Sequence, residues 1–178
     1  QPILNFGTEE QKERFVSLLA SGERLGAFCL TEANAGSDAS GVETHAVLEG
    51  EKYLINGTKI FVTNGGVCSL PLIFAVTGAG DPARNASVFV LEKDMPGFSV
   101  GEIEDLCGMR ANPVSSLFFE DCRVPRENLL GSEGDGIKIA LATLDTGRIG
   151  IAAQAVGIAQ GAFEASVKYS KERQQFRK

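Results

Sequence analysis

The stretch Gly26–Gly41 reads GAFCLTEANAGSDASG and changes character part-way along. It begins with a short apolar run, Ala27–Leu30, and continues as a polar loop that contains several small residues. This change predicts a strand that leads into a loop. Backbone N–H groups and hydroxyls at the end of a rigid strand can bind an anionic or carbonyl-rich ligand. An ordinary connection between two strands has the same pattern, so the loop alone leaves both interpretations open.

The composition indicates a globular protein with a sizeable core. The chain has 178 residues, of which 43% are hydrophobic, and this size suits one domain or one domain with an appendage. A net charge of −6 argues against a nucleic-acid partner bound by a basic face. No apolar run is long enough to span a membrane and no secretory leader is visible, so we expect a reducing compartment such as the cytoplasm.

The cysteines do not form a metal-binding pattern. Cys29, Cys68, Cys107 and Cys122 lie far apart, and His45 is the only histidine. A zinc site needs ligands in closer clusters. We therefore expect free thiols that pack as small hydrophobic side chains, and no metal.

The two ends of the chain lead us to expect a fragment of a longer protein. The sequence opens on Gln1-Pro2 without a methionine. At the other end a helical pattern is cut off without a capping residue.

The chain order predicts a short helix, a β region and a long helix. Thr8-Glu9-Glu10-Gln11 is a capping box, and the apolar spacing after it predicts one helix that ends at Ser21-Gly22. The Asn56-Gly57 pair is typical of a tight turn between neighbouring strands, and Gly50 marks another. We place strands near residues 25–31, 42–49, 52–57, 59–63, 70–77, 86–93, 98–103 and 114–121.

Many short strands separated by turns predict a mainly β fold, an antiparallel barrel or sandwich. From Ile137 to about Arg173, apolar residues recur at helical spacing among many glycines and alanines. A helix of this length needs partners, which we expect in sequence beyond this chain or in another subunit.

Motifs that would indicate a hydrolase or a nucleotide-driven enzyme are absent. The sequence contains no G-x-G-x-x-G, no Walker loop, no H-E-x-x-H and no G-x-S-x-G.

Several motifs together resemble the acyl-CoA dehydrogenase family, in the family's order and over nearly the whole chain. Cys29-Leu30-Thr31-Glu32, followed by Ala35-Gly36-Ser37-Asp38 and Gly41, matches the family signature. The run Asn56–Asn64, NGTKIFVTN, resembles the family's second flavin-contacting strand. Pro96-Gly97-Phe98, Gly108-Met109-Arg110, Phe119–Pro125 and Leu144–Arg148 follow in the same order. The short-chain, butyryl-CoA-type members are the most similar.

The resemblance implies a β middle domain between two helical domains, with FAD as the cofactor. Residues 1–24 would end the N-terminal helical domain, 25–125 would form the β domain, and 126–178 would start the C-terminal helical domain. Thr31 would hydrogen-bond the flavin near N1 and O2, because negative charge accumulates around N1. Thr63 would donate to N5, where the hydride arrives. The other implied FAD contacts are Phe28, Leu30, Gly36, Ser37, Phe61, Val62, Arg173 and Phe176.

The same resemblance implies substrate contacts from Ser37, Leu144, Asp145 and Arg148. Asp145 and Arg148 share a helical face, where they could also form only a solvated ion pair. Without the resemblance, Thr63 would be interpreted as a strand former and Phe61 as a core aromatic. Arg173 and Phe176 would reach FAD of a neighbouring subunit in a homotetramer. The sequence departs from the family pattern at Ala33, at Asn112-Pro113 and at Arg177.

The expected function is the oxidation of a short acyl-CoA to trans-2-enoyl-CoA, with electron-transferring flavoprotein as the acceptor, in the cytoplasm or the mitochondrial matrix. Gly147 occupies the position where some members carry the catalytic base, and Glu164 and Glu172 lie elsewhere. We therefore expect a glutamate beyond Lys178 and no activity from this chain alone. An acyl-CoA oxidase and a non-catalytic binding or assembly module are the alternatives.

Overall fold

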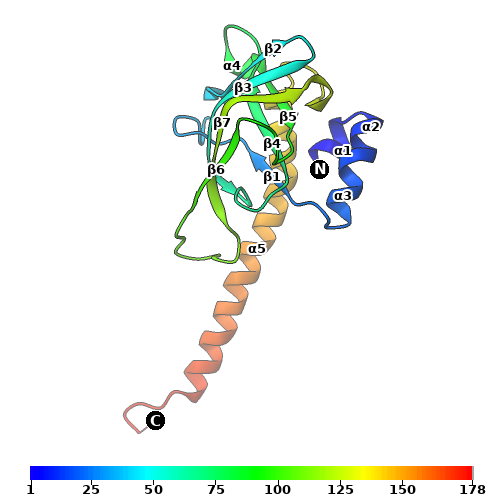
Figure 1. The fold of residues 1–178 in the computed structure, drawn as a ribbon. Helices are drawn as coiled ribbons and strands as arrows, with labels where there is room; N and C mark the ends of the chain where they lie inside the picture. The colour runs from blue at the N-terminus through cyan, green and yellow to red at the C-terminus, as the bar shows by residue number, and fades with distance from the viewer. Residues whose placement is uncertain (178) are drawn as a thin grey trace. The chain divides into compact units, whose positions relative to one another are not determined.

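The strands lie between Gly26 and Leu130 in a computed structural model that describes residues 1–177 (Figure 1). The chain forms two compact units, Gln1–Ala140 and a second that begins at Leu141. The strands are β1 (Gly26–Cys29), β2 (His45–Glu49), β3 (Lys52–Thr63), β4 (Leu70–Val76), β5 (Ala86–Val90), β6 (Phe98–Ile103), β7 (Val114–Pro125) and β8 (Leu129–Leu130). The helices are α1 (Pro2–Phe6), α2 (Glu9–Gln11), α3 (Ser17–Ala20), α4 (Pro82–Asn85) and α5 (Gly136–Glu172).

The predicted capping box at the N-terminus is confirmed. Thr8 Oγ1 accepts from the Gln11 N–H at 3.2 Å, and Gln11 Oε1 accepts from the Thr8 N–H at 3.1 Å. The predicted helix runs without a break from Glu9 to Ala20, with a π-helical stretch, Lys12–Val16, between α2 and α3. The Gln11 amide also donates to the Glu127 and Leu129 carbonyls at 2.7 and 2.8 Å, which attaches this segment to β8.

The strands form one open sheet in the order β6-β7-β3-β2-β4-β5-β8, with β1 beside β4. A single residue pair, His45 with Val76, links β2 to β4. The two halves of the sheet on either side of this link contribute to the same buried cluster, which includes Ile55 of β3 and Phe89 of β5. The sheet therefore covers a common core without closing around it.

The predicted β region between helical segments is confirmed, but its closure into an antiparallel barrel is wrong. Closure would require the strands at the two ends of the sheet to form a ladder. The end strands β6 and β8 do not pair in the described part of the chain, and β8 has only two residues to offer. In addition, β1 and β2 pair with β4 in the parallel sense.

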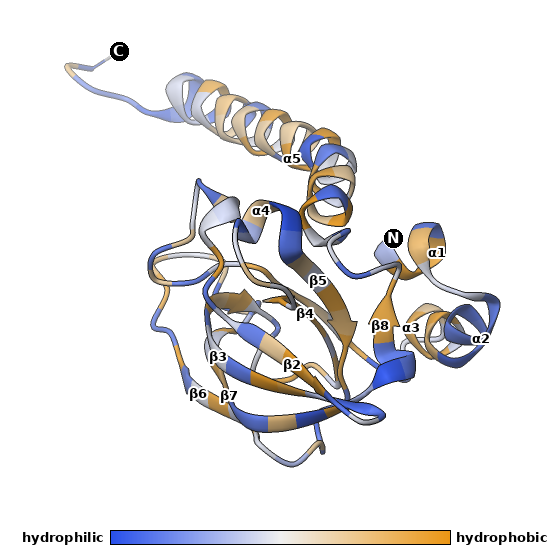
Figure 2. Ribbon diagram, turned by 90° about the horizontal axis from the view of Figure 1, so that it is seen from above, coloured by the Kyte–Doolittle hydropathy of each residue, from blue (hydrophilic) through white to orange (hydrophobic). Residues whose placement is uncertain are grey.

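Strands β4 and β5 are buried on both faces. Ile73 and Phe89 belong to the cluster shared by the two halves of the sheet. Their neighbours Phe74 and Val88 belong to a second cluster, to which Phe15 of the N-terminal segment contributes. Double-sided burial explains why LPLIFAV and ASVFV carry almost no polar residues. Figure 2 shows the hydrophobic colour concentrated on β4, β5 and β8.

The predicted turn at Asn56-Gly57 is wrong, because β3 runs unbroken through it. The pairing with β7 shifts register between Ile55 and Gly57, where Glu120 and Asp121 of β7 lie opposite Asn56 alone, so the bulge is in β7. Gly57 has a φ of 147°, and a Cβ there would lie 2.5 Å from Thr44 Oγ1. The Asn-Gly pair therefore allows Thr44 to approach closely. The turn at Gly50, by contrast, is confirmed, since Glu49 pairs with Lys52 across it.

Helix α5 is confirmed as one continuous helix, close to its predicted bounds. From Leu141 onward its described side chains are almost all exposed, and Ile149 and Phe163 are 75% and 63% exposed. Exposed apolar residues along so long a helix fit the expectation that it needs partners. None of the described helices combines the length and the apolar character that crossing a membrane requires.

All four cysteines are free, as expected, and three of them are buried. Burial raises the pKa of Cys29 well above its ordinary value and the pKa of Cys122 to about 11. Both thiols therefore stay protonated and act as core side chains. Cys107 differs from the expectation because it is exposed.

We expect Gly57→Ala to destabilise the protein by more than about 2 kcal/mol, because overpacking and a positive φ each contribute about 1 kcal/mol or more. Gly50→Asn is the matched control, since Gly50 also has a positive φ but open space around it, and asparagine tolerates that conformation. Urea unfolding of both variants measures the difference. Equal stability of the two variants would contradict the close approach to Thr44.

Candidate functional site

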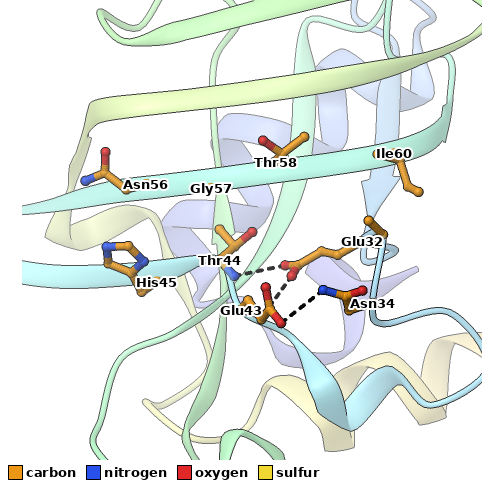
Figure 3. A pocket seen from close by; sticks show the side chains of 10 residues that line it. Glu32, Asn34, Glu43, Thr44, His45, Asn56, Gly57, Thr58 and Ile60 are labelled. Atoms are coloured by element: carbon orange, nitrogen blue, oxygen red, sulfur yellow. Dashed lines mark hydrogen bonds between the residues drawn. The ribbon is translucent and has the colours of Figure 1, made fainter.

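The loop after β1 is closed by the side chain at its start. Glu32 Oε2 accepts from the Glu43 N–H at 2.7 Å, and Glu32 Oε1 accepts from the Thr44 N–H at 3.1 Å. The backbone of Glu32 also exchanges two hydrogen bonds with Ala35, at 3.0 and 3.2 Å. Figure 3 shows the Glu32 carboxylate reaching across the loop to the backbone before β2. One carboxylate thus joins the two ends of the loop.

A buried ion pair attaches this closed loop to β3. Lys59 Nζ lies 2.6 Å from Glu32 Oε1, and the two side chains are 0% and 7% exposed. Lys59 Nζ also donates to the Leu30 carbonyl at 3.2 Å. Burial alone would raise the pKa of Glu32, but the Lys59 charge and the hydrogen bonds to Glu32 hold it below its ordinary value. Burial lowers the pKa of Lys59, and Glu32 partly opposes this effect.

The residue between these contacts, Thr31, is held against β3 by its backbone. The Ile60 N–H donates to the Thr31 carbonyl at 2.9 Å. Thr31 is therefore fixed beside the segment Phe61–Thr63, which ends β3. Thr31 and Thr63 come from separate parts of the chain, and the Ile60 hydrogen bond joins the segment of Thr31 to the strand that ends at Thr63.

The end of β3 presents an aromatic ring to solvent. The pairing with β7 shifts register between Lys59 and Val62, and Phe61 in this bulge has a φ of 52°. Phe61 is 64% exposed, whereas Val62 is 2% exposed. A bulge turns a side chain out of its normal alternation. The interpretation of Phe61 as a core aromatic is therefore wrong, while Val62 is a core residue.

The remaining predicted contacts of the first unit differ in accessibility. Phe28 is half-buried and packs edge-on against Phe74, with ring centroids 4.9 Å apart. Leu30 is 8% exposed and belongs to the second core cluster. Gly36 and Ser37 are exposed in the loop. A Cβ on Gly36 would meet no atom within 4 Å, so the fold itself does not require glycine there.

The predicted residues of the second unit lie on or after α5. Arg148 Nε is 3.6 Å from Asp145 Oδ1, with the two side chains 72% and 77% exposed. Leu144 is 37% exposed one residue before Asp145. Arg173 follows the end of α5, and Phe176 is 96% exposed with a φ of 51°. The solvated ion pair considered from the sequence is therefore present, and both partners are accessible to a ligand.

The first unit offers unused hydrogen-bonding groups beside an exposed ring. In the described part of the chain, the hydroxyls of Thr31 and Thr63 have no protein partner. Phe61 supplies an apolar surface nearby, and Gly36 leaves backbone uncovered. Free donors next to an aromatic surface suit a planar ligand that carries hydrogen-bond acceptors. The isoalloxazine ring of a flavin has these properties, so the residues present fit it.

A separate polar pocket of about 340 Å³ lies beside the loop. Glu32, Asn34, Glu43, Thr44 and Thr58 are among its lining residues, and Figure 3 shows them around it. None of the predicted flavin or substrate contacts lines this pocket. Its carboxylates make it a poor site for an anionic group.

Glu32 and Lys59 both lie within the sequence motifs, but the sequence predicted no role for either residue. A signal was available in β3, where Ile55, Lys59 and Val62 are buried and only Lys59 is charged. A lysine in a strand at a buried position requires an acceptor. The sequence alone does not say which of its many carboxylates supplies that acceptor.

We expect Glu32→Gln to lower the free energy of unfolding by about 3 kcal/mol at pH 7, because it leaves the Lys59 charge buried without a counter-charge. The native pKa of Glu32 lies below its ordinary value of 4.5. The stabilisation by the carboxylate is therefore complete above that pH and is lost as the pH falls through the native pKa. The gap between wild type and variant should shrink as the pH falls below 4.5 in denaturant titrations. Glu43→Gln is the control, and an unchanged gap at low pH would contradict the assignment.

Comparison with known proteins places these residues in a family. Residues 27–122 match the family described as "Acyl-CoA dehydrogenase, middle domain", and residues 134–178 match "Acyl-CoA dehydrogenase, C-terminal domain". The short-chain specific acyl-CoA dehydrogenase of Clostridium acetobutylicum is 54% identical over 98% of this chain and 46% of its own length. This chain thus spans about half the length of the curated relatives that it matches.

Solved structures agree in fold over almost the whole chain. A chain in the structure of the electron transferring flavoprotein of Acidaminococcus fermentans is 55% identical, with a TM-score of 0.95 over 99% of this chain and 47% of that one. An acyl-CoA dehydrogenase of Bacillus anthracis complexed with FAD is 40% identical, with a TM-score of 0.93 over 99% of this chain and 31% of that one. On the matched domains and these identities, the chain belongs to the acyl-CoA dehydrogenase family.

Proposed function

We propose that this chain is part of an FAD-dependent acyl-CoA dehydrogenase that oxidises short acyl-CoA substrates. The observation that carries the proposal is the pair of unused threonine hydroxyls, Thr31 and Thr63, on two segments that the Ile60 hydrogen bond holds together beside Phe61. Family membership and the short-chain relative support it. Residues 1–24 end an N-terminal helical domain, 25–125 form the flavin-contacting β domain, and 126–178 begin a C-terminal helical domain.

Thr31 and Thr63 hold the flavin ring through hydrogen bonds. With FAD bound, Thr31 would donate to the pyrimidine side of the flavin and Thr63 to its central ring, where fixed donors would favour the reduced form. Bound FAD supplies the two-electron acceptor that side chains lack. The other contacts in the first unit are Phe28, Leu30, Gly36, Ser37, Phe61 and Val62.

The second unit contributes to the substrate and to a neighbouring active site. The ion pair of Asp145 and Arg148 is exposed and therefore weak, so Arg148 can exchange its partner for a phosphate or amide oxygen of CoA at little cost. Leu144 is the further substrate contact proposed on this helix, and Ser37 is the one proposed in the first unit. Arg173 and Phe176 extend to FAD of the adjacent subunit in a homotetramer.

The reaction removes one hydrogen from each of the α and β carbons and yields trans-2-enoyl-CoA. The α-proton goes to a glutamate outside this chain, because Gly147 has no side chain to accept it. The exposed apolar length of α5 supports a longer protein in which other helices cover it. Electrons pass to electron-transferring flavoprotein, which the similarity to a chain in the Acidaminococcus structure supports.

We expect the full-length protein to show a flavin absorbance that butyryl-CoA bleaches under anaerobic conditions. Electron-transferring flavoprotein should restore the absorbance much faster than oxygen does. The isolated 178-residue chain is the control and should cause no turnover, because it lacks the base. Rapid recovery with oxygen would indicate an oxidase, and absence of bleaching by any acyl-CoA would indicate a non-catalytic module. Turnover by the isolated chain would contradict the assignment of the base.

We expect Arg148→Gln in the full-length protein to raise the KM for butyryl-CoA roughly tenfold or more and to leave kcat largely unchanged. The reason is that a charged hydrogen bond to CoA contributes to binding in the ground state and the transition state alike. Lys168→Gln, an exposed substitution on the same helix, is the control. Steady-state kinetics of both variants test the role, and an unchanged KM for Arg148→Gln would refute it.

A further inference from the structure

Two adjacent residues of β3 hold three consecutive residues of the loop. Lys59 Nζ contacts the Leu30 carbonyl at 3.2 Å and the Glu32 carboxylate at 2.6 Å. The Ile60 N–H donates to the carbonyl of Thr31, which lies between them, at 2.9 Å. Lys59 therefore fixes the residues on both sides of Thr31, and its neighbour fixes Thr31 itself.

Stability alone does not explain a charged pair at this position. Replacing a buried ion pair with apolar side chains of similar size is often neutral or stabilising. The Lys59 side chain is 0% exposed, so its charge has no role at the surface. An ammonium group with three donors can, however, fix a carbonyl and a carboxylate at defined positions, which an apolar side chain cannot do. The ion pair therefore serves to fix the position of the loop.

We propose that Lys59 is a positioning residue, whose contacts with Leu30 and Glu32 set the Thr31 hydroxyl at the place where it meets the flavin. The inference rests on the proposed function, because it takes FAD as the ligand of Thr31. Lys59 is buried and needs no contact with FAD or with the substrate. Its influence acts through the backbone on either side of Thr31.

The deciding variant is Lys59→Met combined with Glu32→Gln, since Lys59→Met alone leaves a buried carboxylate without its partner. In the full-length protein we expect the double variant to fold and its Kd for FAD to rise about tenfold, the effect of losing one charged hydrogen bond. Hydrogen exchange of the Ile60 amide, measured without FAD, should quicken by a similar factor. Lys59→Arg keeps the charge and should recover part of both losses. Lys52→Met, at the exposed start of the same strand, should change neither.

A folded double variant with wild-type affinity for FAD and unchanged exchange at Ile60 would overturn the proposal. If the double variant does not fold, hydrogen exchange of the Ile60 amide in the wild-type protein tests the proposal instead. There the Ile60 amide should exchange as slowly as the core of β3, and exchange at the rate of the open loop would refute the role of Lys59. Failure of the wild-type protein to bind FAD would instead refute the proposed function, while the exchange measurement would still test Lys59.

Discussion

The site depends on one buried ion pair, between Lys59 and Glu32. The Glu32 carboxylate closes the loop by accepting from the backbone of Glu43 and Thr44, and Lys59 attaches that closed loop to β3. A charge without a partner in this environment would be costly, so neither residue can be replaced alone without loss. The pair couples the fold to the site, because the same atoms that satisfy buried charges also place Thr31 beside the end of β3.

The open sheet supplies the rigid support for this arrangement. Strands β4 and β5 are buried on both faces. One face of the two strands packs in the cluster shared by the two halves of the sheet, and the opposite face packs in the cluster that includes the N-terminal segment. Strand β3 stays continuous through two register shifts, at Gly57 and before Val62. At the first shift the absence of a side chain on Gly57 leaves room for Thr44, and the second shift turns Phe61 towards solvent. The bulge in β3 thus exposes Phe61 while Val62 beside it stays in the core.

The second unit has a different physical character. From Leu141 onward the described part of α5 exposes apolar residues such as Ile149, Val156 and Phe163. Its Asp145–Arg148 ion pair is exposed as well. Such a helix depends on burial by further elements, whereas the loop and β3 obtain their geometry from contacts within the first unit. The residues that we propose to contact the flavin in the first unit are therefore held by contacts within that unit.

The sequence by itself determined the family, the β region, the capping box at Thr8, the long helix and the motifs that contain Thr31 and Thr63. These follow from local patterns of side chains, which the sequence displays directly. Only the tertiary structure decided that the sheet stays open, that β3 continues through Asn56-Gly57, that Phe61 is exposed, and that Lys59 pairs with Glu32. Each of these depends on a contact between residues distant in the chain, such as Thr44 with Gly57. Local patterns predict which residues can form a strand or a turn. Which of the two structures forms depends on the residues that pack against that segment.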